Sequence, residues 1–469
     1  MFPKKYIIIF TVVIILLLIS PLILGPIFKK SQDGPKGASL TLWMLFDEEK
    51  LWNETLSNYT RSFPNVHIKV RKFSDPKEYE TELINALAEG NGPDIFMLKN
   101  TWVRKHKNKV LPLTTPTEIS YFNTVYPQIA MNDLEGEITY KDAANKTVKE
   151  QALFGVPLSI DTLALIVNKS IYRQYIVGRN LPGATWEDLK ADTRAITQKD
   201  ANGLVLGSIA MGDINLRHGV DILHLLFAEA EPAYIDASRS VYAFGQSSVR
   251  DAATLWFMFS DASNTLYTWD PARLMSPLPD RDEVGSFAAG KIAMMFGYSY
   301  DIMDIKTEIA LLKREGKTAI DPSQIAVVEV PVFNPLRKRT IGSYYPLFVS
   351  KDSKSPETAW HFLSFIMHTK DLEQSYSKKT LRPPAKTALQ TEYVKDPLMA
   401  PFAAQINRAE SIPMTDEAKY ITLMQQFGAV PYPRFTSDIS SRLSILGQKA
   451  QCLLDQSLGK PQAMNKTCM

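Results

Sequence analysis

The side chains best suited to metal binding or covalent catalysis form no recognisable site in this sequence. Its six histidines include no pair at metal-ligand spacing, and His361 and His368 lie seven residues apart on one predicted helix. The sequence has no G-x-S-x-G nucleophile motif, no phosphate-binding P-loop and no H-E-x-x-H helix. We therefore expect a protein that is not an enzyme and holds no metal or cofactor. Glycosidase carboxylates can be dispersed along a chain, so an anchored hydrolase remains an alternative.

The two cysteines, Cys452 and Cys468, both lie near the C-terminus. Their spacing suits neither a zinc site nor a redox motif. In an exported domain they would close a loop of about 15 residues, worth at most a few kcal/mol. Two separate thiols in a C-terminal tail are the alternative.

The N-terminal end predicts a membrane anchor. Residues 6–28 carry no charge, and at about 1.5 Å per residue they are long enough to cross about 30 Å of hydrocarbon. No convincing small-x-small cleavage site follows, so we predict an uncleaved transmembrane anchor over residues 1–30 and a polar linker over residues 31–37. The N-terminal lysines account for the net charge of +3, which leaves the remaining chain nearly neutral and gives no indication of nucleic-acid binding.

Strand and helix patterns alternate in the first hundred residues. Apolar or alternating strands are predicted at residues 39–46, 66–73 and 95–98, with helices between them. Pro76 and Gly90 mark the start and the end of the second helix. This order predicts an α/β fold with a largely parallel sheet, in which ligands bind just beyond the carboxyl ends of strands.

The same patterns continue along the chain. Residues 154–168 read as a turn and a long extended run, and Thr185 is a helix N-cap. Strands are predicted at residues 292–296, 325–330 and 344–350, and a helix begins at Ser355.

Six of these segments together resemble the sugar-type extracellular solute-binding proteins of ABC importers, the group that includes maltose-binding protein. In chain order they are S-L-T-L-W-M-L-F from Ser39, A-L-A-E-G-N-G-P-D-I-F from Ala86, F-G-V-P-L-S-I-D-T-L-A-L-I-V-N-K-S-I-Y from Phe154, T-W-E-D-L from Thr185, S-F-A-A-G-K-I-A-M-M-F-G from Ser286 and S-P-E-T-A-W-H-F-L from Ser355. Each segment is weak evidence alone, but six in the same order over about 350 residues are specific.

The resemblance implies a two-lobed, periplasmic-binding-protein-like (type II) α/β fold with a hinge. On that pattern, residues 38–157 and 297–342 form one lobe, and residues 158–296 and 343–469 form the other. The chain would cross between the lobes near residues 157–161, 297–300 and 342–345.

The resemblance also implies a ligand site between the lobes. Sugars have apolar faces and polar rims, so aromatic rings with carboxylate and hydroxyl groups are the expected lining. The positions that match the family's contact positions are Trp43, Phe46, Thr101, Trp102, Asp161, Tyr298, Ser299, Tyr300, Ser343, Tyr344 and Arg382. Trp43 in the core of its strand and Asp161 as a hinge or helix cap are the competing interpretations.

Three features of the sequence leave the chemical identity of the ligand open. Gly297 is followed by Tyr298 where the maltose-type pattern has Trp, which puts maltodextrin itself in doubt. The basic residues 104–109 would attract a sugar phosphate or uronate if they faced the cleft, and otherwise are a solvated surface. The pair Tyr344 and Tyr345 resembles the tyrosines of ferric-ion binding proteins.

The expected protein is therefore a monomeric, membrane-anchored solute-binding subunit with its large domain outside the cell. It would capture an oligosaccharide or related polyol between its lobes and deliver it to the permease of an ABC transporter. A ferric-ion binding protein and a binding protein coupled to a membrane sensor are the alternatives.

Overall fold

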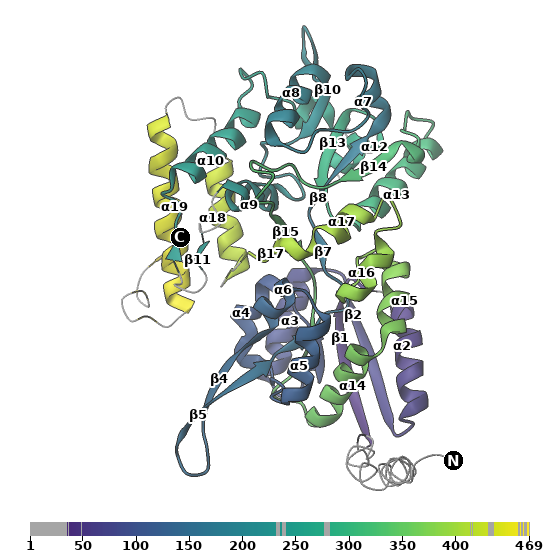
Figure 1. Ribbon diagram of the computed structural model, residues 1–469, viewed down its shortest axis with the longest axis vertical. Helices are drawn as coiled ribbons and strands as arrows, with labels where there is room; N and C mark the ends of the chain where they lie inside the picture. Colours follow the sequence, from purple (N-terminus) through teal and green to yellow (C-terminus); the bar gives the residue numbers. More distant parts are fainter. Residues whose placement is uncertain are drawn as a thin grey trace, which may run out of the picture.

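The computed structural model describes residues 37–230, 241–275, 282–412, 416–429 and 436–457, except residue 48, together with residues 35, 235–236, 414, 460, 463 and 467–468. The predicted anchor, residues 1–30, lies outside the described residues. Within the described part of the chain, no helix is both long and apolar enough to cross a membrane. The chain folds into two α/β lobes, one above the other, joined by short strands (Figure 1).

The first lobe is built on a five-stranded sheet in the order β2-β1-β3-β16-β6. Its strands are β1 (Ala38–Leu45), β2 (Val66–Phe73), β3 (Ile95–Met97), β16 (Leu347–Val349) and β6 (Gly155–Val156). Strands β2 and β3 pair parallel with β1, as their helical connections predicted, while β16 pairs antiparallel with both β3 and β6. The sequence prediction of a largely parallel sheet therefore holds for the three N-terminal strands.

Helices cover this sheet and complete the first core. They are α2 (Glu49–Ser62), α3 (Pro76–Ala88), α4 (Val103–His106), α5 (Pro116–Val125), α6 (Gln128–Leu134), α14 (Pro356–His368) and α15 (Lys370–Thr380), with the short 3₁₀ turns η1 (Asn100–Trp102) and η2 (Lys107–Lys109). A hairpin of β4 (Glu135–Lys141) and β5 (Thr147–Leu153) projects from the lobe (Figure 1).

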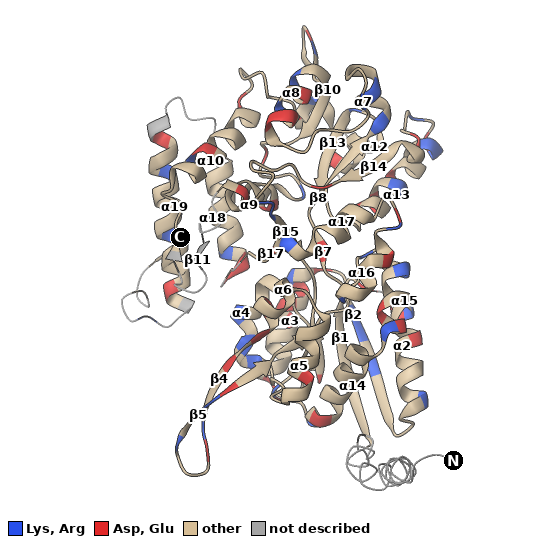
Figure 2. Cartoon of the chain, viewed as in Figure 1, with Lys and Arg blue, Asp and Glu red and all other residues tan. Residues whose placement is uncertain are grey.

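The second lobe has a five-stranded sheet in the order β14-β8-β13-β10-β9. Its strands are β14 (Ile325–Val328), β8 (Ala164–Asn168), β13 (Ile292–Gly297), β10 (Gly203–Ala210) and β9 (Gln198–Asp200). A second hydrophobic core, which includes the buried Trp186 and Trp256, forms around it. Acidic and basic residues are interspersed over both lobes (Figure 2).

The second lobe carries the larger set of helices. They are α7 (Lys169–Tyr175), α8 (Trp186–Ile196), α9 (Gly219–Ala230), α10 (Ser247–Ser260), α11 (Pro271–Leu274), α12 (Glu283–Ala288), α13 (Asp301–Arg314), α18 (Glu417–Gly428) and α19 (Thr436–Ser457), with η3 (Pro322–Gln324) and the small pair β11 (Ile235–Asp236) and β12 (Val241–Tyr242). A disulfide joins Cys452 of α19 to Cys468, one of the two possibilities that the sequence left open.

Three short strands connect the lobes in a sheet of their own, in the order β17-β15-β7. They are β7 (Asp161–Thr162), β15 (Thr340–Ser343) and β17 (Ala409–Glu410). Helices α16 (Thr387–Tyr393) and α17 (Ala400–Ala404) and the turn η4 (Ile406–Arg408) lie beside them. This sheet is the hinge, and two of its strands fall at the crossings expected near residues 157–161 and 342–345.

The strand pairing corrects the expected division of the chain. Strand β14, predicted within the first lobe, pairs with β8 of the second lobe, whereas β16, predicted within the second lobe, pairs with β3 of the first. Helix α13 also packs in the second core, so the chain does not change lobes at residues 297–300. The third crossing comes later, between Ala385 in the first core and Met399 in the second.

The predicted helix start at Thr185 is confirmed as a capping box. The Thr185 hydroxyl accepts a hydrogen bond from the Asp188 N–H (3.1 Å), and the Asp188 carboxylate accepts one from the Thr185 N–H (3.1 Å). These bonds satisfy backbone donors that a helix leaves free at its N-terminus.

Replacing Thr185 by Ala is therefore expected to lower the free energy of unfolding by about 1 kcal/mol. Thr185→Ser, which keeps the hydroxyl, is the matched control and should stay within a few tenths of a kcal/mol of the parent. Urea unfolding measures both. Equal losses in the two variants would show that the cap does not stabilise α8.

Candidate functional site

A cavity of about 860 Å³ lies between the lobes beside the hinge. Its walls come from the first-lobe loops after β1 and β3, from the hinge, and from the second-lobe segments around α9, β13 and α18. Predicted site residues that line it are Phe46, Asp161, Tyr298, Tyr300, Ser343, Tyr344 and Arg382. These residues are up to 336 positions apart, so the fold brings together most of the positions that the family pattern indicated.

The other four predicted residues are placed behind the cavity wall. Trp43 is 7% exposed and packs against Phe73, with the Arg71 guanidinium 4.8 Å from its ring. Thr101 and Trp102 are buried and hydrogen-bond to Glu417, which itself lines the cavity.

Asp161 joins the hinge to the second-lobe sheet. Its Oδ2 accepts hydrogen bonds from the Ser299 N–H (3.0 Å) and the Ser299 hydroxyl (2.6 Å), and its Oδ1 accepts one from the Thr162 N–H (2.9 Å). Ser299 is the fourth predicted site residue that lies behind the cavity wall. It is fully buried and holds the cavity residue Asp161 in place. Burial raises the pKa of Asp161 to about 7, although the Ser299 hydrogen bonds act in the opposite direction.

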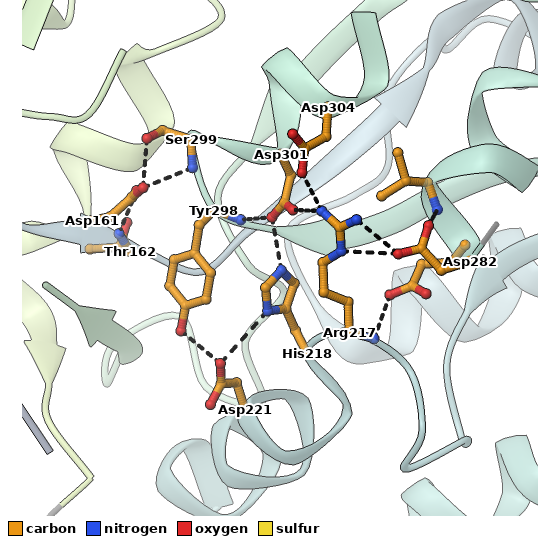
Figure 3. Close-up of polar contacts among 12 residues, drawn as sticks. Asp161, Thr162, Arg217, His218, Asp221, Asp282, Tyr298, Ser299, Asp301 and Asp304 are labelled. Carbon is orange, nitrogen blue, oxygen red and sulfur yellow. Dashed lines mark hydrogen bonds and ion pairs between the residues drawn. The ribbon is translucent and has the colours of Figure 1, made fainter. Parts of the chain in front are cut away.

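A polar network supports the second-lobe wall (Figure 3). Asp301, at the start of α13, accepts hydrogen bonds from the Tyr298 N–H (2.7 Å), His218 Nε2 (2.8 Å) and Arg217 Nη1 (2.9 Å). The Tyr298 hydroxyl donates to Asp221 (3.0 Å). Burial acts to lower the pKa of His218, but the Asp301 carboxylate outweighs it and the pKa is raised. This network fixes the orientation of Tyr298 before any ligand binds.

Aromatic rings face each other from the two lobes. On the second lobe, Tyr298 and Tyr300 stack with centroids 5.7 Å apart. On the first, Phe46 meets Tyr345 edge to face at 5.6 Å and keeps 39% of its surface exposed. The Phe46 backbone is left-handed (φ 68°), which costs about 1 kcal/mol or more for a bulky side chain. Such strain is typical of positions that present a side chain to a ligand.

Arg382 lies in the cavity wall on the first-lobe side. Its Nη1 donates to Asp47 Oδ1 (2.9 Å) and to the Tyr376 hydroxyl (2.7 Å). Burial acts to lower the pKa of Arg382, but Tyr376 and Asp47 outweigh it and raise the pKa. The guanidinium is therefore a fixed donor whose charge is already paired.

Several cavity residues were missed by the sequence reasoning. They are Lys99, Ser159, Arg217, His218, Asp221 and Glu417, while Tyr345, expected only as half of a ferric-ion-type pair, lines the cavity as well. Lys99 directly follows the strand predicted at residues 95–98, and Tyr345 directly follows the predicted site residue Tyr344, so local position signals both. Arg217, His218 and Glu417 reach the cavity only through the packing of α9, α13 and α18, which no local pattern reveals.

The basic run at residues 104–109 does not line the cavity. Lys105 and His106 bind Glu80 (2.9 and 2.8 Å), and Lys107 lies 4.1 Å from the Phe154 ring centre. In the described part of the chain, no cluster of three or more His, Cys, Asp or Glu side chains is arranged to hold a metal ion.

The sequence profile of the bacterial extracellular solute-binding proteins matches residues 41–370, well over half of the chain. The chain belongs to the bacterial extracellular solute-binding protein family. This confirms the family that the sequence motifs resembled, and with it the two-lobed fold. No curated protein sequence matches this solute-binding protein.

Solved structures share the fold of this solute-binding protein at low sequence identity. The sugar-binding protein MalE from Xanthomonas citri matches with a TM-score of 0.70 at 15% identity, covering 92% of this chain and 100% of its own. A cyclo/maltodextrin-binding protein complexed with maltotetraose matches with 0.65 at 16% identity, covering 92% and 99%. A substrate-binding protein from Listeria monocytogenes in complex with cycloalternan matches with 0.62 at 16% identity, covering 90% and 100%.

The raised pKa of Asp161 predicts a pH-dependent contribution to stability. The native carboxyl keeps its proton up to about pH 7, while the unfolded carboxyl loses it near its ordinary value of 3.8. Between these values the native state binds more protons, so the stability that Asp161 contributes falls as pH rises, by at most about 1.4 kcal/mol per pH unit.

Urea unfolding of the parent and of Asp161→Asn at pH 4.5 to 7.5 isolates this contribution. Burial also raises the pKa values of Glu229 and Glu283 to about 7. These two groups titrate in both proteins, so their effect cancels when the two stabilities are subtracted. The stability of the parent minus that of the variant should decrease with rising pH. A difference that does not change with pH would contradict the assignment.

Proposed function

We propose that this solute-binding protein captures a carbohydrate between its lobes and delivers it to the permease of an ABC transporter. The observation that carries the proposal is the cavity at the hinge, whose walls come from both lobes and combine aromatic rings with carboxylates and hydroxyls. A ligand that touches both walls favours the conformation in which the lobes are close together, which is a shape change that a permease can recognise.

The size and lining of the cavity favour a carbohydrate. A volume of about 860 Å³ falls within the range of about 300–1,000 Å³ common for small-molecule sites. Phe46, Tyr300 and Tyr345 offer apolar faces, while Asp161, Asp221 and Ser343 supply polar groups that can bind hydroxyls. Solved relatives of the fold are complexes with maltotetraose and cycloalternan, which supports an oligosaccharide for this chain as well.

In this proposal, residues 6–28 anchor the protein to the outer face of the cell membrane. The anchor would raise the effective concentration of the binding domain near the permease. ATP hydrolysis in other subunits would drive ligand release, and this chain would carry out no covalent chemistry.

A thermal-shift screen of the full-length chain in detergent micelles tests this function. The panel contains neutral oligosaccharides, polyols, sugar phosphates, amino acids, short peptides and ferric citrate. Ligand at about 100 times its dissociation constant should stabilise the native state by about 2.7 kcal/mol, and we expect a shift with one class of carbohydrate. A shift with ferric citrate, amino acids or peptides alone would refute a carbohydrate-binding function.

Replacing Phe46 or Tyr300 by Ala should weaken carbohydrate binding about 10- to 100-fold, because each removes an aromatic face worth about 1.5–3 kcal/mol of burial. Tyr140→Ala is the matched control, since Tyr140 is 45% exposed on the β4–β5 hairpin and does not line the cavity. Isothermal titration calorimetry measures all three. If both cavity variants bound carbohydrate as tightly as the parent protein does, Phe46 and Tyr300 would not belong to the binding site.

A further inference from the structure

One carboxylate of the second lobe, that of Glu417, lines the cavity and hydrogen-bonds to residues of the first lobe. Glu417, the first residue of α18, accepts hydrogen bonds from Lys99 Nζ (2.6 Å) and the Thr101 hydroxyl (2.9 Å) at its Oε1, and from Trp102 Nε1 at its Oε2. The three donors follow β3 at its carboxyl end, the usual position of ligand contacts in an α/β sheet. Glu417 therefore occupies a position on the first lobe where a ligand is expected.

The three donors are complementary to a carboxylate. An ammonium, a hydroxyl and an indole N–H converge on two oxygens, and both Lys99 and Glu417 line the cavity. The side chains are 23% and 11% exposed, so water screens the pair only weakly. Burial acts to lower the pKa of Lys99, but the Glu417 charge outweighs it and raises the pKa.

The other cations of the cavity wall are also paired with carboxylates of the protein. Arg382 binds Asp47 (2.9 Å), and Arg217 binds Asp301 (2.9 Å) and Asp304 (2.5 Å). Among the described residues that line the cavity, three Lys and Arg stand against four Asp and Glu. An anionic ligand would thus meet no uncompensated cation, and at Lys99 it would compete directly with Glu417.

We propose that Glu417 is a specificity-determining residue that fills an anion subsite formed by Lys99, Thr101 and Trp102. This inference rests on the proposed capture of a ligand in the cavity. While Glu417 is present, the cavity accepts uncharged ligands and rejects acidic ones, and the same contact holds the lobes together. Removing the Glu417 carboxylate leaves three convergent donors that bind a carboxylate supplied by a ligand.

Acetate tests the subsite without any assumption about the sugar. In Glu417→Ala, acetate should raise the melting temperature of the full-length chain by about 1–2 °C at roughly ten times its dissociation constant, relative to chloride at equal ionic strength. The parent should show no such shift. Absence of an acetate-specific shift in Glu417→Ala would overturn the proposal.

Two controls separate the subsite from a general charge effect. Asp416→Asn removes a neighbouring negative charge but keeps an effective N-cap for α18 and leaves the Glu417 contacts in place, so it should not respond to acetate. The double variant Lys99→Met/Glu417→Ala lacks both charges and should lose the acetate response. An equal response in either control would also overturn the proposal. Glu417→Ser, whose short side chain also leaves the subsite empty, replaces Glu417→Ala if that variant does not fold, and the expected acetate response is the same.

Glucuronate distinguishes this inference from the proposed function. It should stabilise Glu417→Ala more than acetate does, because its ring reaches the aromatic walls, and it should stabilise Glu417→Ala more than the parent. Equal effects of acetate and glucuronate would support the anion subsite but count against carbohydrate capture. Carbohydrate binding by the parent without an acetate response in Glu417→Ala would support the function and refute the role of Glu417.

Discussion

The two hydrogen bonds from Ser299 to Asp161 are the interaction on which the site depends. Asp161 belongs to the hinge strand β7, and Ser299 follows β13 of the second-lobe sheet. A buried carboxyl that lost these donors would be costly in free energy, so the hinge and the end of β13 must keep their relative position. That position in turn sets where Tyr298 and Tyr300 face the cavity.

The two walls of the cavity differ in how firmly they are held. On the second lobe, Asp301 binds the Tyr298 backbone, His218 and Arg217 together, so that wall is preorganised by a satisfied polar network. On the first lobe, Phe46 has a strained backbone after β1, packs edge to face with Tyr345 and keeps 39% of its surface exposed. A polar network thus holds Tyr298 in place on the second lobe, whereas the ring of Phe46 on the first lobe is partly exposed.

Local sequence signals predicted most elements of this fold but not their assignment to lobes. The proline, glycine and capping residues at Pro76, Gly90 and Thr185 act within one turn of chain, and the structure has helix ends at these positions. Strands β14 and β16 look alike in sequence, and which sheet each joins depends on partners more than 150 residues away. The exchange of these two strands explains the error in the expected boundaries.

In the candidate site, too, local sequence signals identified some residues, while residues placed by long-range packing were missed. Positions that directly follow strands, such as Phe46 and Tyr298, line the cavity as the family pattern indicated. Trp43 could not be distinguished from a ligand contact by sequence, because burial in its strand depends on packing against Phe73. Glu417 could not be found at all, since its partner Lys99 lies 318 residues away in sequence.

Hydrogen–deuterium exchange of the full-length chain, with and without the carbohydrate that gives the largest thermal shift, tests the capture of a ligand between the lobes most directly. The account predicts slower exchange on both sides of the cavity, in the peptides that contain Phe46, Tyr300 and Tyr345, and at the hinge strands. Protection confined to one lobe, or to a surface away from these residues, would contradict it.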